Sequence, residues 1–584
     1  MPELEGLLFF AQLISELLFD YSLDTYKLPA LNSRLLTLEL LYSIKEYEAN
    51  FLKLGALKPI VNELQDRLHK DPVIKEIMTR YYIDYLSMLK DDTSVPEIKN
   101  RVQFLNNKIS ESFFPTCKTL LREAVLGSRE KEKITRLTRI FLIELINRGH
   151  SSEYIYFESD KFFFEGTFPS RISDPELIDK FFDLFSLEKK QYIVMYRAGR
   201  NIRTIRDYAP SLDLEVIESV PELSFRGKSE VVEEFLQNNE EYPLFLVVKD
   251  IKSHDRDKAR EEADNRLFLV DSLAKYHVHR RNLRIGDNAL IYSHDQTEFG
   301  IVRKPRSPVM KRPDRPFENL ASLIQKTVST ITTENLDEES IERLTRAFWL
   351  HNTGIRASAP QSQLLEFWSA IEVLFPPRGP DTDRIVQIVD CMVPFIASEY
   401  GAKLAADLYS SIKRAGSPEA LEILEEIAEG DNPIEKCLAL ISIKANEPIR
   451  ERFYSLYEWH PLLRNRIFYL TKRFSSADLV LKTLQAHAER VSWQIGRIYR
   501  ARNLIIHSGK SLPYINILVE NLHSYLDRVL DLLNEEISRS NHPITLDQIT
   551  LEIKLQTESH LRNLKNLGKL ECTAENYKQI LFGN

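Results

Sequence analysis

The chain has 584 residues, of which 43% are hydrophobic and 28% are charged, and its formal net charge is −8. These proportions are typical of a soluble globular protein, and the length indicates several domains. A negative net charge excludes nucleic-acid coating by the whole surface, but it is compatible with a local basic cleft. Glycine is scarce, with 18 residues, so the composition predicts a mostly α fold.

The N-terminal sequence and the cysteines together indicate a cytoplasmic protein. Acidic residues interrupt the apolar start of the chain and no basic segment precedes it, which predicts an amphipathic helix and not a signal peptide. No run of about 18 uncharged apolar residues occurs, so we expect no membrane contact. The four cysteines lie far apart and form no CxxC motif, as expected for unpaired thiols in a reducing compartment.

The first half of the chain is predicted to contain two domains. Residues 1–150 carry apolar side chains at three- and four-residue steps and are predicted to form a helical domain. Residues 151–303 are predicted to form a mixed α/β domain, because aromatic and β-branched runs appear there. Its expected strands are 154–157, 162–164, 191–196, 244–248, 288–293 and 298–302, and its expected helix is 255–274.

The second half is predicted to be helical again after an interruption. Residues 304–334 form a basic, Pro-rich linker and a first helix, and proline at that density resists regular structure. This segment either connects two domains as a plain linker or lies along the protein surface as a strap. Residues 335–540 are predicted to form a helical bundle, and residues 541–584 a C-terminal appendage.

The segment Tyr499–Lys510, YRARNLIIHSGK, carries the chemistry that we consider most informative. Asn503 and His507 are four residues apart, so on a helix they project from nearly the same face. Arg502 lies about 140° around the helix from His507 and roughly 7.5 Å along its axis, a separation that a guanidinium arm can span. Ser508-Gly509 predicts the helix end. Such a group of side chains could bind a phosphate and transfer a proton, although a helix end facing water is the alternative.

This segment resembles the Arg-x(4–6)-His signature of HEPN domains. The upstream segment LLEFWSAIEVLF, residues 364–375, is similar to a helix of ApeA-like HEPN domains. The resemblance covers about residues 335–540. It implies a helical bundle that dimerises and, in many members, cleaves RNA without a metal, whereas other members only bind. It also implies that Arg502, Asn503 and His507 are catalytic and that Glu372 holds an arginine in place.

Two features of the sequence compete with this assignment. Arg500 and His507 fit the longer spacing of the signature, so Arg500 and Arg502 compete for one role. Arg346 and His351, in RAFWLH, also have four residues between them. Ala347 follows Arg346 and bulky aromatic residues fill the gap, so we interpret this second match as a core-packing helix.

Weaker basic clusters lie in the central domain. Arg197, Arg200 and Arg203 recur every three residues and on a helix would form a row able to follow phosphates. Arg280 and Arg281 belong to a second cluster. A solvated face is the simpler interpretation of the first cluster. No metal site and no cofactor are expected.

We therefore expect a metal-independent endoribonuclease of the HEPN type that acts in antiphage defence or abortive infection. Its partners would be RNA, including tRNA as a candidate, a second copy of the chain in a homodimer or higher homo-oligomer, and a phage-derived trigger. The first 330 residues would sense that trigger or select the RNA. The alternatives are a non-catalytic RNA-binding or scaffold protein with the HEPN fold and a nucleotide-sensing regulator.

Overall fold

The computed structural model describes most of the chain and divides it into two compact units. Unit 1 comprises Met1–Leu13, Asp20–Arg139 and Ser307–Asn584, and unit 2 comprises Ile14–Phe19 and Ile140–Arg306. The described residues are 4–23, 25–50, 52, 54–89, 93–127, 130–165, 172, 174–220, 222–237, 239–280, 282–312, 319–332, 335–377 and 383–583. Helices dominate and the strands form one small sheet, so the predicted mostly α fold is confirmed.

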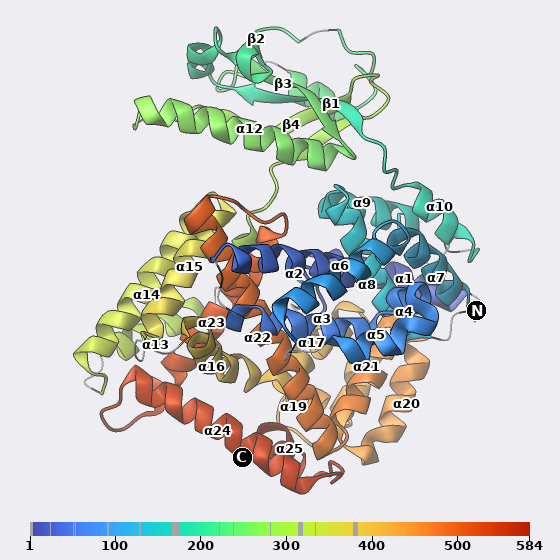
Figure 1. Cartoon of the computed structure of the whole chain (residues 1–584), viewed down its shortest axis with the longest axis vertical. Coiled ribbons are helices and arrows are strands. Elements are labelled where there is room, and N and C mark those ends of the chain that lie inside the picture. The colour runs from blue at the N-terminus through green and yellow to red at the C-terminus, as the bar shows by residue number, and fades with distance from the viewer. Residues whose placement is uncertain are drawn as a thin grey trace. The chain divides into compact units, whose positions relative to one another are not determined.

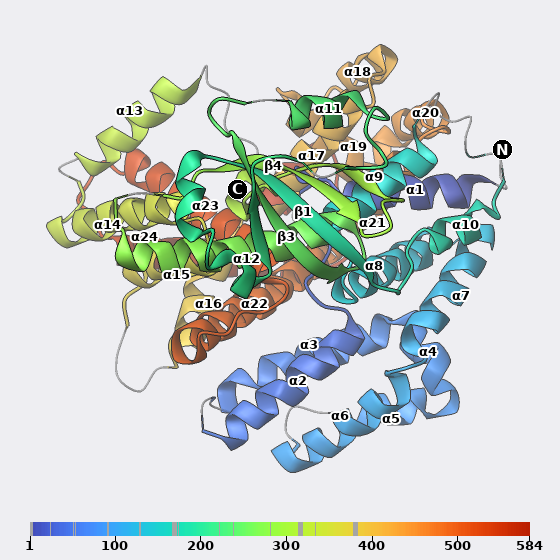
Figure 2. The ribbon, with the colours of Figure 1, turned by 90° about the horizontal axis from the view of Figure 1, so that it is seen from above.

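The N-terminal part of the chain is helical, and the side chains of Asn32 and Asp71 cap two of its helices. They are α1 Glu5–Leu18, α2 Ser33–Glu48, α3 Lys58–Lys70, α4 Pro72–Met78, α5 Tyr82–Met88, α6 Val95–Ile109, α7 Phe113–Gly127 and α8 Lys131–Asn147. The Asn32 side chain accepts the N–H of Leu35 and starts α2. Helix α2 lies beside α3 and α6 (Figure 2) and buries Leu36, Leu40 and Ile44, which recur every four residues.

The C-terminal helices of unit 1 pack around the 32-residue helix α22. They are α13 Leu320–Ile331, α14 Glu338–Arg356, α15 Pro360–Leu374, α16 Arg384–Ala397, α17 Tyr400–Arg414, α18 Pro418–Glu425, α19 Pro433–Ser442, α20 Glu447–Leu456, α21 Pro461–Phe474, α22 Ala477–Ser508, α23 Ile515–Arg539, α24 Leu546–Leu567 and α25 Tyr577–Phe582. Helices α14 and α15 lie side by side (Figure 1).

Helix α22 belongs to two hydrophobic cores. Its first half packs Ala477, Val480 and Leu484 into a core formed mainly by α17–α21. Its second half packs Ile495 and Ile498 into a core formed mainly by α14, α15, α16 and α23. In the part of the chain that the structure describes, no single helix has the length and apolar character to cross a membrane, although α16 and α17 together, bent by 46°, pass that test.

Unit 2 contains a five-stranded antiparallel sheet with the strand order β2-β3-β1-β4-β5. Its elements are α9 Ser152–Phe163, α10 Leu177–Asp183, β1 Lys190–Ala198, β2 Leu214–Ile217, α11 Glu230–Leu236, β3 Leu244–Ser253, α12 Arg256–His277, β4 Ile285–Ser293 and β5 Phe299–Arg303. Helix α12 lies along one face of the sheet (Figure 1) and packs Ala259, Ala263 and Leu267 against Tyr192 and Val194. The helix and four strands predicted for residues 191–302 are therefore confirmed.

Two strand predictions in this unit are wrong, and one strand was not predicted. The aromatic runs at 154–157 and 162–164 lie in and next to α9, because Ile155, Ser159 and Phe163 recur every four residues and form its buried face. Short aromatic runs are compatible with either a strand or a buried helix, and here the four-residue recurrence decides for the helix. Strand β2 is a four-residue edge strand, too short to carry a periodic signal.

The basic segment after unit 2 lies along unit 1 as a strap where the structure describes it. A 3₁₀ turn, Pro308–Lys311, buries Val309 in the same core as α15 and α23. Lys311 pairs with Asp20 at 3.2 Å, and Arg312 pairs with Asp527 of α23. Residues 307–312 therefore form a strap along the surface, which is the second of the two alternatives for this linker. Residues 313–318 lie outside the described part.

Candidate functional site at the C-terminal end of α22

Helix α22 ends where Ser508-Gly509 predicts, and glycine is required there. Gly509 has φ +65° and ψ +5°, a left-handed backbone conformation that residues other than glycine rarely adopt. Its N–H donates to the Ile505 carbonyl at 2.9 Å and closes the last turn. The motif residues Arg502, Asn503 and His507 therefore all lie in the last two turns of one helix.

Arg502 is half-buried and has two polar neighbours. Its Nη2 lies 3.5 Å from Oε2 of Glu372 on α15, and its Nη1 donates to Oδ1 of Asn503 at 3.1 Å. The Arg502 and Glu372 side chains are 25% and 28% exposed, so solvent reaches both. A guanidinium carries five N–H donors, so these two contacts leave donors available for a phosphate.

A second arginine approaches Glu372 from the start of α16. Nη2 of Arg384 donates to the Glu372 carbonyl at 3.2 Å. Burial lowers the pKa of Arg384, while the nearby Glu372 carboxylate acts in the opposite direction. The junction of α15, α16 and α22 therefore brings two guanidinium groups to Glu372, Arg502 at its carboxylate and Arg384 at its backbone carbonyl.

His507 lies in the last turn of α22 and is exposed. No hydrogen bond or ion pair joins its ring to another of the residues that the structure describes. Asn503, one turn earlier, projects from nearly the same face. The ring is therefore open to solvent at the helix end.

Arg500 serves a different purpose from Arg502. Its Nη2 pairs with Oε1 of Glu39 on α2 at 2.8 Å, and its side chain is only 9% exposed. Arg497, one turn before, pairs with Glu39 at 3.2 Å and with Glu63 of α3 at 2.6 Å. Although burial lowers the pKa of Arg497, these two carboxylates raise it overall. Between the two competing arginines, only Arg502 is placed to meet a ligand.

The arginine row expected in the central domain does not form on a helix. Arg197 lies on β1, is 8% exposed, and donates to the backbone carbonyls of Phe235, Tyr242 and Gln237. The strand ends at Ala198, so Arg197 cannot share a helical face with the arginines after it. Arg200 and Arg203 lie in an exposed 3₁₀ turn and Arg280 is exposed after α12, whereas Arg281 lies outside the described residues.

The second motif match leads to a polar cluster that the sequence did not indicate. Helix α14 packs Leu344 and Ala347 into a core, as predicted. His351 on the same helix is 24% exposed, and its Nε2 lies 2.8 Å from Oδ1 of Asp527 on α23. His523 of α23 lies one turn before Asp527, and burial lowers its pKa to about 4. The pair His523 and Asp527 is visible in the sequence as a four-residue spacing, but its meeting with His351 depends on helix packing.

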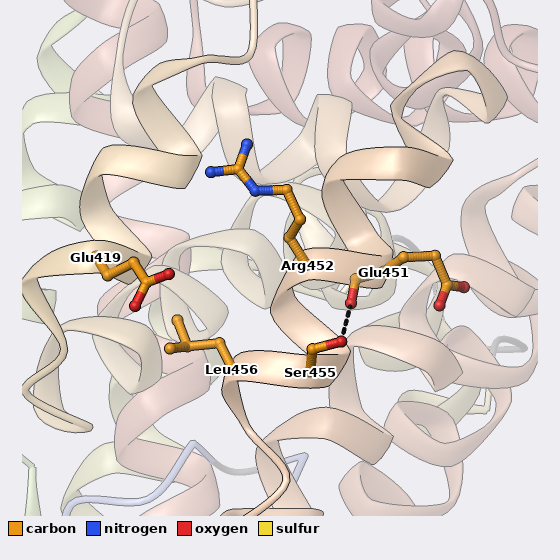
Figure 3. Close-up of a pocket in the computed structure, with 5 residues that line it drawn as sticks. All are labelled: Glu419, Glu451, Arg452, Ser455 and Leu456. Carbon is orange, nitrogen blue, oxygen red and sulfur yellow. Dashed lines mark hydrogen bonds between the residues drawn. The ribbon is translucent and has the colours of Figure 1, made fainter.

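The hollow shown in Figure 3 lies away from these motif residues in the sequence and involves none of them. Glu419 of α18 and Glu451, Arg452, Ser455 and Leu456 of α20 line it. Arg452 is paired with Glu426, and Ser455 donates to the Glu451 carbonyl at 3.1 Å. It is open and mixed in charge, and its arginine is already paired with Glu426, so we assign it no function.

Comparison with protein-family models, with curated proteins and with solved structures found no match to this chain.

Proposed function

We propose that the chain is a metal-independent endoribonuclease of the HEPN type, with its site at the C-terminal end of α22. The observation that carries the proposal is the combination of a half-buried Arg502, held by Glu372 and Asn503, with an exposed imidazole at His507 five residues later. These groups supply a phosphate-binding cation and a proton-transfer group on one helix.

The reaction needs three contributions from the protein. RNA is cleaved without a metal when the 2′-hydroxyl attacks the adjacent phosphorus and the 5′-oxygen leaves, giving a 2′,3′-cyclic phosphate. A base must take the 2′-proton, an acid must protonate the leaving oxygen, and positive charge must stabilise the phosphorane. Histidine titrates near neutral pH and serves as base or acid, while arginine stays charged and binds two phosphate oxygens together.

One His507 supplies only half of the proton transfer. A second copy of the chain would supply another His507, so the proposed enzyme is a homodimer in which two α22 ends share one RNA-binding cleft. Glu372 and Asn503 both contact the Arg502 guanidinium, which lowers the entropy lost when that group binds phosphate. The regions before residue 330 would select the RNA or sense a trigger of cleavage.

The proposal is tested by incubating the purified protein with total RNA in EDTA. We expect discrete fragments, and we expect His507→Ala and Arg502→Ala each to reduce the cleavage rate about 10²–10⁴-fold, the usual contribution of a proton-transfer group or an oxyanion contact. The matched controls are Arg346→Ala and His351→Ala, which have the same spacing in the same unit. Cleavage that is lost in the controls but kept in His507→Ala would refute the assignment.

The second candidate function is a non-catalytic RNA-binding protein with the same fold. It predicts that RNA binds with an affinity that Arg502→Ala weakens, while no fragments form. Gel-shift and cleavage assays on the same samples separate the two functions.

A further inference from the structure

The cluster formed by α14 and α23 lies outside the proposed ribonuclease site and brings together three side chains that commonly bind metals. Nε2 of His351 lies 2.8 Å from Oδ1 of Asp527, and Nε2 of His523 lies 3.6 Å from the same oxygen. The three candidate ligand atoms all lie within 4.8 Å of one another. Two imidazole nitrogens therefore converge on one carboxylate oxygen.

These separations are close to those of a tetrahedral site. Ligand atoms at about 2.0–2.1 Å from Zn²⁺ with tetrahedral angles lie roughly 3.3 Å apart. The observed 2.8 Å and 3.6 Å fall on either side of that value. The two imidazole nitrogens lie within 4.8 Å of each other, so binding one ion at all three atoms requires the side chains to close around it.

The surroundings hold the three groups in place. The His523 ring stacks on Phe367 of α15, with a centroid distance of 5.0 Å and an interplanar angle of 8°, and the His351 ring lies 5.6 Å from the same phenyl ring. Arg312 of the strap pairs with Oδ2 of Asp527, which fixes the carboxylate and leaves Oδ1 facing the two imidazoles. Contacts of this kind orient the ligands in known metal sites.

The cluster is partly open to solvent. The side chains of His351 and Asp527 are 24% and 19% exposed, while that of His523 is 9% exposed. Solvent therefore reaches His351 and Asp527 more than His523, and a water molecule from that side could supply a fourth ligand. Two neutral imidazoles, one carboxylate and a water suit a divalent first-row transition metal, with Zn²⁺ as the leading candidate.

We infer that His351, His523 and Asp527 bind one Zn²⁺ or a chemically similar divalent transition metal, and that this site is separate from the α22 end. A bound ion would connect α14 to α23 and, through Asp527 and Arg312, to the strap. This inference does not depend on the proposed ribonuclease activity, because its test measures metal binding alone.

The test is calorimetric titration of chelator-treated full-length protein with Zn²⁺, supported by visible absorption on adding Co²⁺. We expect saturation at about one ion per chain, as for a mononuclear site. Loss of an outer-shell partner typically weakens binding about 10–100-fold, so His351→Ala and Asp527→Asn, which remove ligands, should weaken it beyond about 100-fold. They should also abolish the upward shift of the thermal midpoint that Zn²⁺ causes in the wild type.

His69→Ala is the matched control, because His69 is exposed at the end of α3 and belongs to no such cluster among the described residues. It should bind Zn²⁺ with unchanged affinity. Circular dichroism checks that each variant is folded. Absence of saturable binding to the wild type, or equal affinity in the wild type, His351→Ala and Asp527→Asn, would overturn the inference and leave the cluster as an ion-pair network.

Discussion

At the scale of single residues, burial separates charged groups that the sequence presents as equivalent. Arg497, Arg500 and Arg502 follow one another on α22, but the first two are paired with Glu39 and at most 9% exposed, whereas Arg502 is 25% exposed. Removing one partner from a buried ion pair typically costs about 3–5 kcal/mol, because the other charge is left without compensation. Arg497 and Arg500 are therefore structural residues beside a candidate functional one.

A histidine far from the site in the sequence makes a testable contribution to pH-dependent stability. Burial lowers the pKa of His460 to about 4, and its Nδ1 accepts the Leu463 N–H at 3.2 Å, which caps α21. The unfolded histidine titrates at about 6.5, so between pH 6.5 and pH 4 the unfolded state binds more protons. Stability therefore falls as the pH decreases through this range.

We expect His460→Asn, which keeps a capping acceptor but does not titrate, to lose less stability between pH 7 and pH 5 than the wild type. The difference between the two proteins should approach about 2 kcal/mol, from 1.36 kcal/mol per pH unit below pH 6.5. Urea unfolding at the two pH values measures it. Equal losses in the two proteins would show that His460 does not titrate as described.

At the scale of elements, close helix packing depends on a glycine. Gly354 of α14 faces Phe367 of α15, and a Cβ atom there would lie 2.5 Å from the phenyl ring. The ring is fully buried and stacks on His523, so it has little room to move. A methyl group at this position would force α14 and α15 apart or tilt the phenyl ring.

Gly354→Ala is expected to destabilise unit 1 by about 1–3 kcal/mol, the usual cost of overpacking, reduced by the better helix propensity of alanine. Gly496→Ala in α22 is the matched control, because its Cβ would meet only the Arg500 guanidinium at an ordinary 3.6 Å. It should stabilise the protein by up to about 1 kcal/mol. Urea denaturation compares the two, and a similar gain in both variants would contradict the packing argument.

Element types were predictable where the periodicity was long and the end signals were strong. Helix α12 and strands β1 and β3 follow clear patterns, and Gly509 marks the end of α22. The aromatic segment of α9 was misassigned because its side chains favour strands locally while their four-residue recurrence buries one helical face. Local preference is a weak guide wherever packing decides the outcome.

At the scale of the whole chain, the first helices and the C-terminal helices belong to one compact unit. Composition separates residues 1–150 from residues 335–540, but Arg497 pairs with Glu39 and Glu63 across 458 and 434 residues. Neither segment alone contains a sequence pattern that predicts this pairing. For the same reason the sequence could place Arg502, Asn503 and His507 on one helix but could not decide between Arg500 and Arg502, or bring His351 to Asp527.

The central claim is that the end of α22 cleaves RNA with its own side chains. The most direct measurement is the chemistry of the fragment ends after incubation with RNA in EDTA. The account predicts 2′,3′-cyclic phosphate and 5′-hydroxyl ends from the wild type and from His351→Ala, and none from His507→Ala. Wild-type protein that binds RNA but leaves it intact, or cyclic phosphate ends that persist in His507→Ala, would contradict it.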